Sequence, residues 1–267
     1  MAGKLLPKLD FTLDFYTIAL RDRIVLGTEI SSSGNPTNPL DILLKQNKLL
    51  DLSFFSNALD TRTAGLDLVL ASKNTPLGKG FLDLNLSGNY QLTNKRIGEV
   101  KDIAIVKNAG QSVVNATHER LFFTSRPKAK FILGSQYRLG KFAFNLNNTY
   151  FGKTTFKQDG LNENLRTEFV PKIITDLAIV VEIANKTTLM LNSNNLFNIL
   201  PEWEFVEENA AGQALIEDTS LTSTGLTPLQ NESNLITFNQ RYAQMTYDGF
   251  HFSQLGTLFN LSLNYRF

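Results

Sequence analysis

Hydrophobic and polar residues alternate with a period of two along most of the chain. From Leu9 to Phe15 every odd position is apolar, and positions 10, 12 and 14 are polar. A period of two places successive side chains on opposite faces of a β-strand. Eight segments follow this pattern, at residues 9–19, 64–71, 82–92, 130–138, 142–149, 172–183, 187–197 and 254–267. No segment gives a convincing helical period, so the sequence predicts an all-β chain of about eight strands.

The connections between these strands alternate strictly between short and long. The short connections lie at residues 73–79, 140–141 and 184–186. The long connections lie at about residues 27–60, 93–127, 157–170 and 198–249. In an antiparallel up-and-down sheet this order places every tight turn at one end and every long loop at the other. That asymmetry is typical of bacterial outer-membrane barrels, which have short periplasmic turns and long outer loops.

Strand length and strand chemistry favour the same fold. Several segments reach 12 or more alternating residues, whereas strands of globular proteins usually have five or six and a bilayer needs roughly 9–11. The polar face carries charged residues, namely Asp10, Asp14, Asp67, Asp83, Lys130, Lys172, Asp176, Glu182 and Arg266. The apolar face would meet lipid in a transmembrane β-barrel, or a second sheet in a soluble sandwich. We predict the barrel, and a soluble β-sheet binding module remains an alternative.

Composition excludes several functional classes. The 26 basic and 25 acidic residues leave a net charge of +1, so no basic excess is available for nucleic acid. No apolar run approaches the roughly 18 residues of a membrane helix. Without cysteine, disulfides, thiolate metal sites and cysteine nucleophiles are absent. His118 and His251 fall in or beside predicted loops and are interpreted as solvated residues. We therefore predict no enzyme activity, no metal site and no cofactor.

The last residues of the sequence alternate between apolar and polar side chains and end in an aromatic residue. The apolar positions are Phe259, Leu261, Leu263, Tyr265 and Phe267. This segment resembles the C-terminal β-signal of outer-membrane proteins, which the barrel-assembly machinery reads in that class. An ordinary edge strand that happens to end in phenylalanine is the alternative interpretation.

Other segments resemble the C-terminal third of TonB-dependent outer-membrane receptors, of a Bacteroidetes-like type. They are residues 13–18 and 126–131 and the motif Asn194, Asn195, Leu196, Phe197 and Asn198. The resemblance implies a receptor in the outer membrane of a Gram-negative bacterium, in contact with lipid and lipopolysaccharide. It further implies import of a bulky solute, such as an iron chelate, cobalamin or a glycan, with energy that TonB delivers through a plug domain.

The sequence also departs from that family. Its barrel has about 22 strands around a plug, whereas residues 1–267 supply about eight strands and no plug-like segment, TonB box or signal peptide. We therefore expect residues 1–267 to form a partial transmembrane barrel domain. Eight strands are also enough to close a small barrel. An autonomous eight-stranded outer-membrane barrel with a structural or adhesion role is thus the second interpretation.

Ligand contacts, if present, are expected in the outer loops, because barrels bind at their mouths. Residues 93–130 contain eight basic and three acidic side chains, whereas residues 198–249 contain eight acidic and one basic side chain. We expect these two loops to pack over the mouth and to select a charged ligand or a surface lipoprotein. Solvated loops facing lipopolysaccharide are the alternative. The candidate ligand-binding residues are Glu204, Glu207, Glu208, Lys107 and Arg120.

Overall fold

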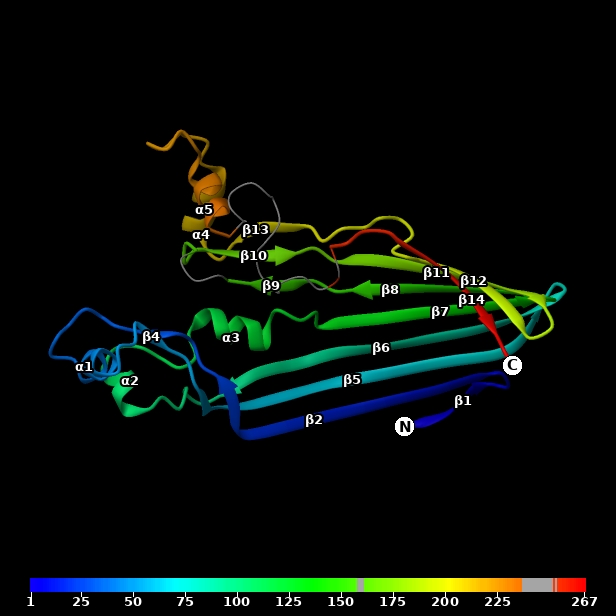
Figure 1. Ribbon diagram of the computed structural model, residues 1–267, viewed down its shortest axis with the longest axis horizontal. Coiled ribbons are helices and arrows are strands. Elements are labelled where there is room, and N and C mark those ends of the chain that lie inside the picture. The colour runs from blue at the N-terminus through cyan, green and yellow to red at the C-terminus, as the bar shows by residue number, and fades with distance from the viewer. Residues whose placement is uncertain (158–160, 237–251, 253) are drawn as a thin grey trace.

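A single antiparallel sheet dominates the computed structural model, which describes residues 1–157, 161–236, 252 and 254–267 (Figure 1). Its nine strands lie in the order β1-β2-β5-β6-β7-β8-β11-β12-β14. Their bounds are Ala2–Leu6 (β1), Leu9–Leu26 (β2), Phe55–Leu77 (β5), Gly80–Ile97 (β6), Ala129–Leu139 (β7), Phe142–Phe151 (β8), Lys172–Ala184 (β11), Thr187–Asn194 (β12) and Leu258–Tyr265 (β14). Each strand therefore pairs with a neighbour that is also next or nearly next in sequence.

All eight strands expected from the alternation are present, as β2, β5, β6, β7, β8, β11, β12 and β14. The strand β1 was missed because Ala2–Leu6 does not alternate; it forms by pairing with β2 across a tight turn. The strand β5 has 23 residues, far more than the eight expected, because the pairing continues beyond the apolar segment. At the ends of the sheet, β1 and β14 do not pair with each other among the described residues. The sheet is open, and the closed eight-stranded barrel is not observed.

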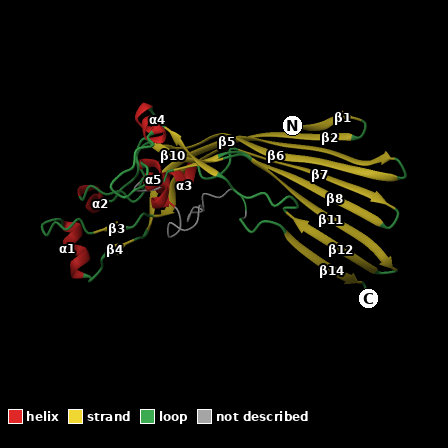
Figure 2. Ribbon diagram, turned by 90° about the horizontal axis from the view of Figure 1, so that it is seen from above, coloured by secondary structure: helices red, strands yellow, loops and turns green. Residues whose placement is uncertain are grey.

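Tight turns and long connections segregate to opposite ends of this sheet. Figure 2 shows the turns at one end and the helices at the other. The turns lie at residues 7–8, 78–79, 140–141 and 185–186, and the long connections at 27–54, 98–128, 152–171 and 195–257. Gly78 and Gly140 both have φ 57°, a backbone region that glycine enters without steric cost. The expected alternation of short and long connections is confirmed.

The two faces of the sheet differ in chemistry, as the strand registers show. One cross-strand row contains Leu13, Leu68, Gly88, Phe131, Tyr150 and Ile173. The next row, on the other face, contains Asp14, Asp67, Asn89, Lys130, Phe151 and Lys172. Apolar side chains of the first face are exposed, including Leu13, Phe15, Tyr90, Leu133, Phe144, Ile173, Leu191, Phe259, Leu261 and Leu263. The apolar face is therefore not the inside of a sandwich.

The expectation of no helix was wrong. In the described residues of the long connections there are five short helices: Pro39–Gln46 (α1), Ala104–Asn108 (α2), Ala116–Phe123 (α3), Ala210–Glu217 (α4) and Pro228–Ile236 (α5). Each has five to nine residues, too few to show a 3.6-residue period. Asn38, Asn115 and Asn209 cap three of them by accepting bonds from backbone N–H groups of the first turn. Among the described residues, no helix is both long and apolar enough to span a bilayer.

Short strands accompany the helices in the long connections. Ile30–Ser31 (β3) pairs with Asp51–Leu52 (β4). A three-stranded sheet contains Trp203–Glu207 (β13), Leu165–Phe169 (β10) and Thr154–Phe156 (β9), with β10 in the middle. The described parts of the long connections thus contain short helices and strands, and they lie together beyond one end of the main sheet (Figure 1).

Two apolar cores hold these connections in place. The first loop core contains Val25, Ile30, Leu40, Leu44, Ala58, Leu59, Val106, Val113, Val114 and Phe123. The second loop core contains Phe156, Leu161, Leu165 and Phe169, with Leu121, Trp203, Phe205, Leu215, Ile216 and Leu229 packed against it. The helix α3 contributes to both cores, through Phe123 and Leu121 respectively. Most of the fully buried side chains belong to these two loop cores, which include the ends of β2 and β5 nearest the long connections.

Candidate functional site: the charged loop junction

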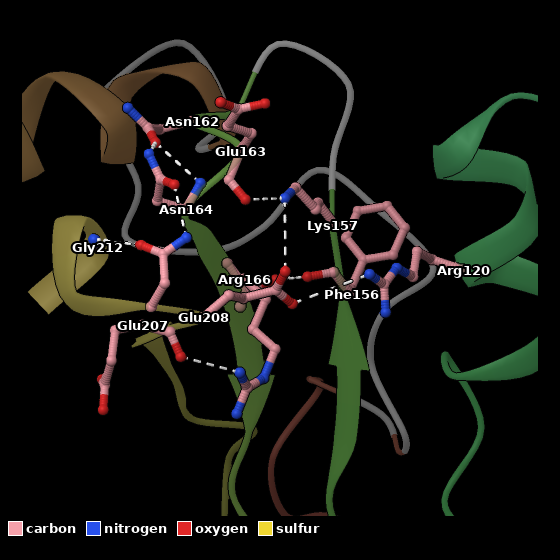
Figure 3. Close-up of polar contacts among 12 residues, drawn as sticks. Arg120, Phe156, Lys157, Asn162, Glu163, Asn164, Arg166, Glu207, Glu208 and Gly212 are labelled. Carbon is pink, nitrogen blue, oxygen red and sulfur yellow. Dashed lines mark hydrogen bonds and ion pairs between the residues drawn. The ribbon is translucent and has the colours of Figure 1, made fainter.

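The loop junction is the place where three long connections meet through charged side chains. It is defined by Arg120 on α3, Lys157 after β9, Arg166 on β10 and Glu208 after β13 (Figure 3). Next to these polar groups, Phe156 is almost fully buried in the second loop core. The core fixes the backbones of β9, β10 and α3, and therefore fixes the positions from which the charged side chains extend.

Glu208 links two cations that come from different connections. Its Oε1 lies 3.9 Å from Arg120 Nη2, and its Oε2 lies 3.7 Å from Lys157 Nζ. Lys157 also donates a hydrogen bond to the backbone carbonyl of Glu163, and the Glu208 N–H donates to the carbonyl of Asn164 at 2.8 Å. Partly exposed pairs of this kind each contribute less than about 1 kcal/mol. They align the connections with one another but do not hold them together.

A second group of charges lies along β10. Arg166 donates from Nη1 to the carbonyl of Glu207 at 3.0 Å, and its Nη2 lies 3.8 Å from Glu168 Oε2. Lys153 Nζ reaches the same carboxylate at 3.0 and 3.1 Å. Glu168 lies directly opposite Glu204 in the β10–β13 register, where two like charges repel. The two cations around Glu168 offset that repulsion.

An asparagine network joins α4 to the junction. Asn209 accepts hydrogen bonds from the backbone N–H groups of Ala211 and Gly212, and donates from Nδ2 to Asn164 Oδ1 at 2.7 Å. A Cβ atom at Gly212 would lie 2.2 Å from the carbonyl oxygen of Asn164. Only glycine therefore allows α4 to approach so closely. Asn162 extends the network to α5, because its N–H donates to Glu232 Oε2 at 2.9 Å.

The structure brings together only part of the predicted ligand-binding set. Arg120 and Glu208 are in contact, so the basic and acidic loops do meet. Glu204 and Glu207 lie exposed on the neighbouring strand β13. Lys107 lies exposed in the last turn of α2, next to the first loop core instead of the second. Whether any of these residues contacts a ligand stays a prediction.

Sequence reasoning missed the contribution of the third connection. Lys157, Arg166 and Glu168 all lie between residues 152 and 171, and all three make ion pairs within the junction. The available signal was the alternation at positions 165–169, where the charged residues 166 and 168 lie between Leu165, Thr167 and Phe169, which indicates a short strand. Because this stretch was interpreted as an unstructured loop, the strand β10 and its charged residues were missed.

Histidine does not form a metal site in the described part of the chain. His118 lies half-buried in α3, with its Nδ1 3.2 Å from Asn115 Oδ1. Burial lowers the pKa of the His118 imidazole below its ordinary value, which favours the neutral form at neutral pH. No group of three potential metal-ligating side chains occurs among the described residues, and His251 lies outside them.

The motif from Asn194 to Asn198 forms a corner at the end of β12. Asn195 is 7% exposed and has φ 50°. Its Nδ2 donates to the Ile199 carbonyl at 2.7 Å, and its Oδ1 accepts from the Ile199 N–H at 2.9 Å. The backbone N–H of Asn195 donates to Asp176 Oδ1, and its carbonyl accepts from Thr257 Oγ1. The motif therefore ties β11 and the approach to β14 to the end of β12.

The segment that resembles a β-signal lies on the edge strand β14. Phe259, Leu261, Leu263 and Tyr265 point to the apolar face and are exposed. The ring of Tyr265 meets that of Phe267 edge-on, with centroids 5.3 Å apart. In the described residues, one edge of β14 pairs with β12 and its outer edge pairs with no other strand. Recognition by an assembly machinery stays a prediction.

Comparisons with known proteins give structural neighbours only. No protein-family model and no curated sequence matches the chain. The ferric-catecholate import receptor Fiu of Escherichia coli K12 is 14% identical with a TM-score of 0.48, over 100% of this chain and 26% of the receptor. The pyoverdine outer-membrane receptor FpvA of Pseudomonas aeruginosa PAO1 is 12% identical with a TM-score of 0.43, over 75% and 25%.

A third similar structure is that of a complex between FpvAI and pyocin S2, with 14% identity and a TM-score of 0.45, over 77% of this chain and 24% of the other. The chain spans about a quarter of the length of each of these three proteins. None of these three proteins supports the expected Bacteroidetes lineage, which stays a prediction.

Proposed function

We propose that residues 1–267 form part of the wall of an outer-membrane β-barrel, and that the complete protein is a TonB-dependent receptor. The observation that carries the proposal is the exposed apolar face of the main sheet. Ten apolar side chains on that face are exposed, each by more than a third. Leaving a half-exposed Leu or Phe uncovered forgoes roughly 1 kcal/mol of burial. The sum of about 10 kcal/mol is comparable with the whole stability of a domain, so something must cover this face.

Lipid is the covering that fits the rest of the sheet. The opposite face carries Asp14, Asp67 and Lys130 in adjacent strands, which suits a wet lumen. All tight turns lie at one end and all long connections at the other, as in barrels that are inserted from the periplasm. A second protein layer would explain the apolar face but not this segregation of turns.

The open edges of the sheet support a larger barrel. Strands β1 and β14 each leave one edge unpaired in the described residues, and an unpaired backbone group in hydrocarbon costs several kcal/mol. Further strands that pair with both edges would remove this cost. On this proposal the plug domain also lies outside residues 1–267, and TonB acts on the plug.

The complete receptor would import a bulky solute, with an iron chelate, cobalamin or a glycan as the candidate classes. The barrel-assembly machinery would insert it, with β14 as the signal strand. The loop junction would lie outside the membrane, facing lipopolysaccharide and any surface lipoprotein. No catalytic role is proposed for any residue.

Single-cysteine variants test the membrane placement, because the chain has no cysteine of its own. Leu13→Cys and Ile173→Cys sample the apolar face, and the matched controls Asp14→Cys and Lys172→Cys sample the adjacent row of the polar face. Each variant of the full chain would be spin-labelled after reconstitution into phospholipid vesicles. Labels on the apolar face should be relaxed by dissolved oxygen, and labels on the polar face by a water-soluble nickel chelate. Equal accessibility of Leu13→Cys and Asp14→Cys to the nickel chelate would contradict the proposal.

Uptake assays test the transport function separately. A strain that lacks the complete gene would be compared with its parent for uptake of labelled ferric chelate, cobalamin and oligosaccharide. Loss of uptake of one class, together with the same loss in a TonB-deficient strain, supports the receptor. Unchanged uptake of all three classes would refute this import function while leaving the barrel test unaffected.

A further inference from the structure

Two basic side chains of the main sheet lie on its apolar face. Arg62 on β5 pairs directly with Lys95 on β6, and these two strands lie side by side in the sheet (Figure 1). Arg62 is four residues from Leu66, which belongs to the apolar face together with its partner Phe15. Side chains alternate between faces along a strand, and the register of β5 with β2 is unbroken between these positions. Arg62 and Lys95 therefore share the apolar face, and we name them the outer basic pair.

The register brings the two cations of the outer basic pair together. Side chains that lie directly opposite each other on one face have Cβ atoms about 4.5–5.5 Å apart. Both residues are exposed, and in the described residues neither side chain takes part in a hydrogen bond or an ion pair. Like charges in this arrangement destabilise a sheet. An anion bound between Arg62 and Lys95 would remove that repulsion.

The neighbouring carboxylates are engaged by another cation. Asp60 lies two residues beyond Arg62 on β5, so it shares the face of the outer basic pair. Lys101 Nζ lies 2.5 Å from Asp60 Oδ1 and 2.7 Å from Asp22 Oδ1. The backbone N–H of Asp22 also donates to Asp60 Oδ1, at 2.8 Å. These contacts direct both carboxylates to Lys101, and the outer basic pair keeps its positive charge.

The outer basic pair lies just beyond the apolar band, at the end of the sheet that carries the long connections. The last pair of large apolar side chains before it is Leu66 with Tyr90. Tyr90 is 46% exposed, and tyrosine is enriched where a bilayer meets water. The segment from Leu66 to Arg62 spans about 13 Å of strand, or about 10 Å along the membrane normal at the usual tilt. This depth corresponds to the headgroup layer, where a charge on the lipid-facing side is tolerated.

The chemistry of the outer basic pair suits a phosphate group. A guanidinium presents two parallel N–H donors that match two phosphate oxygens, and a lysine ammonium adds a point charge. In the membrane placement proposed above, the long connections lie outside the cell. The lipid at this depth is then lipopolysaccharide, whose headgroup is phosphorylated.

We propose that the outer basic pair binds a phosphate group of lipopolysaccharide in the outer leaflet, with Arg62 as the bidentate donor and Lys95 as the second cation. Lipid reaches this face only if the apolar band lies in the bilayer. The site therefore rests on the proposed membrane placement, but not on the import of any solute.

The test uses the full chain folded in detergent micelles in phosphate-free buffer. It would be titrated with lipid A, the phosphorylated anchor of lipopolysaccharide, and with dephosphorylated lipid A. Native mass spectrometry would measure the fraction of the chain that carries each lipid. The variants are Arg62→Gln, Lys95→Gln and the charge reversal Lys95→Glu. Lys130→Gln is the matched control, because Lys130 is exposed near the same end of the sheet but on the polar face.

We expect the unmodified chain to bind lipid A about fivefold more tightly than its dephosphorylated form. Arg62→Gln and Lys95→Gln should each reduce this preference by about threefold, and Lys130→Gln should leave it unchanged. Lys95→Glu should abolish the preference and yet raise the denaturant midpoint of the lipid-free chain, because it places an opposite charge across from Arg62. That variant separates loss of the site from loss of the fold.

The two lipids also separate failure of the site from failure of the membrane placement. Equal binding of both lipids by the unmodified chain, or equal loss of the preference in Lys130→Gln and Lys95→Gln, would overturn the site alone. Binding of neither lipid would refute the membrane placement and the site together. Inorganic phosphate is the third probe. Its failure to displace lipid A at equal concentration supports the lipid assignment, and displacement would assign the pair to a soluble anion and overturn it.

Discussion

Replacement of Asn195 should destabilise the corner between β12 and β14 by an amount that the structure allows us to work out. The side chain makes two hydrogen bonds with the backbone of Ile199, at 2.7 and 2.9 Å. Each such bond contributes about 0.5–1.5 kcal/mol. The residue also has φ 50°, where a non-glycine side chain other than Asn or Asp costs roughly 1–2 kcal/mol. Asn195→Ala should therefore lower the free energy of unfolding by about 2–5 kcal/mol.

Glycine at the same position separates the two contributions. Asn195→Gly loses both hydrogen bonds but tolerates positive φ, so it should cost about 1 kcal/mol less than Asn195→Ala. Phe197→Ala is the control within the motif, because Phe197 is 65% exposed and should change stability by less than about 0.5 kcal/mol.

Denaturant titration of the full chain in micelles, followed by the fluorescence of Trp203, would measure these differences. Trp203 is a suitable reporter because it packs against the second loop core, eight residues from Asn195. Equal destabilisation by alanine and glycine would refute the argument from the backbone angle. A cost below about 0.5 kcal/mol for both would refute the role of the side-chain bonds as well.

Three other changes have outcomes that follow from single features. Gly88→Ala should destabilise the sheet by about 1–3 kcal/mol in the same titration, because the new Cβ would lie 2.0 Å from the ring of Phe131. Gly134→Ala should cost less than about 1 kcal/mol, because its Cβ would meet only the flexible side-chain amide of Asn147. Because the pKa of His118 is lowered in the folded protein, the unfolded chain takes up a proton first as the pH falls. The free energy of unfolding should therefore be highest above the ordinary pKa of 6.5 and decline below it, and His118→Gln should remove this decline. Phe267→Ala should reduce the amount of protein that extracts with outer-membrane barrels severalfold, whereas Phe197→Ala should not.

The sequence predicted the main sheet well because alternation reports directly on its two faces. Residues 172–183, for example, correspond almost fully to β11 (Lys172–Ala184). It did not predict β1, since the segment Ala2–Leu6 becomes a strand only by pairing with β2. A strand at the edge of a sheet needs no buried face, and so its sequence need not alternate.

The loop end was predicted poorly for a different physical reason. The helix α3 has only eight residues, and its identity as a helix depends on Phe123 and Leu121 entering two cores assembled from distant segments. The capping residue Asn115 was a local signal, although asparagine is equally common in turns. The contact between Arg120 and Glu208 was anticipated from opposite loop charge, but Lys157 and Arg166 enter through the fold of β9 and β10, which local sequence does not specify.

The position of α3 between two cores has a consequence for any exchange of loops between related proteins. A two-turn helix that presents Leu121 to one core and Phe123 to the other cannot be replaced without refilling both. A graft that swaps residues 98–128 alone would leave a void in the first loop core and another in the second. Recombination that respects this architecture has to transfer all four long connections together, because the fourth also packs against the second loop core. Within the fourth connection, the stretch around Gly225, which lies in open space, can accept insertions by itself.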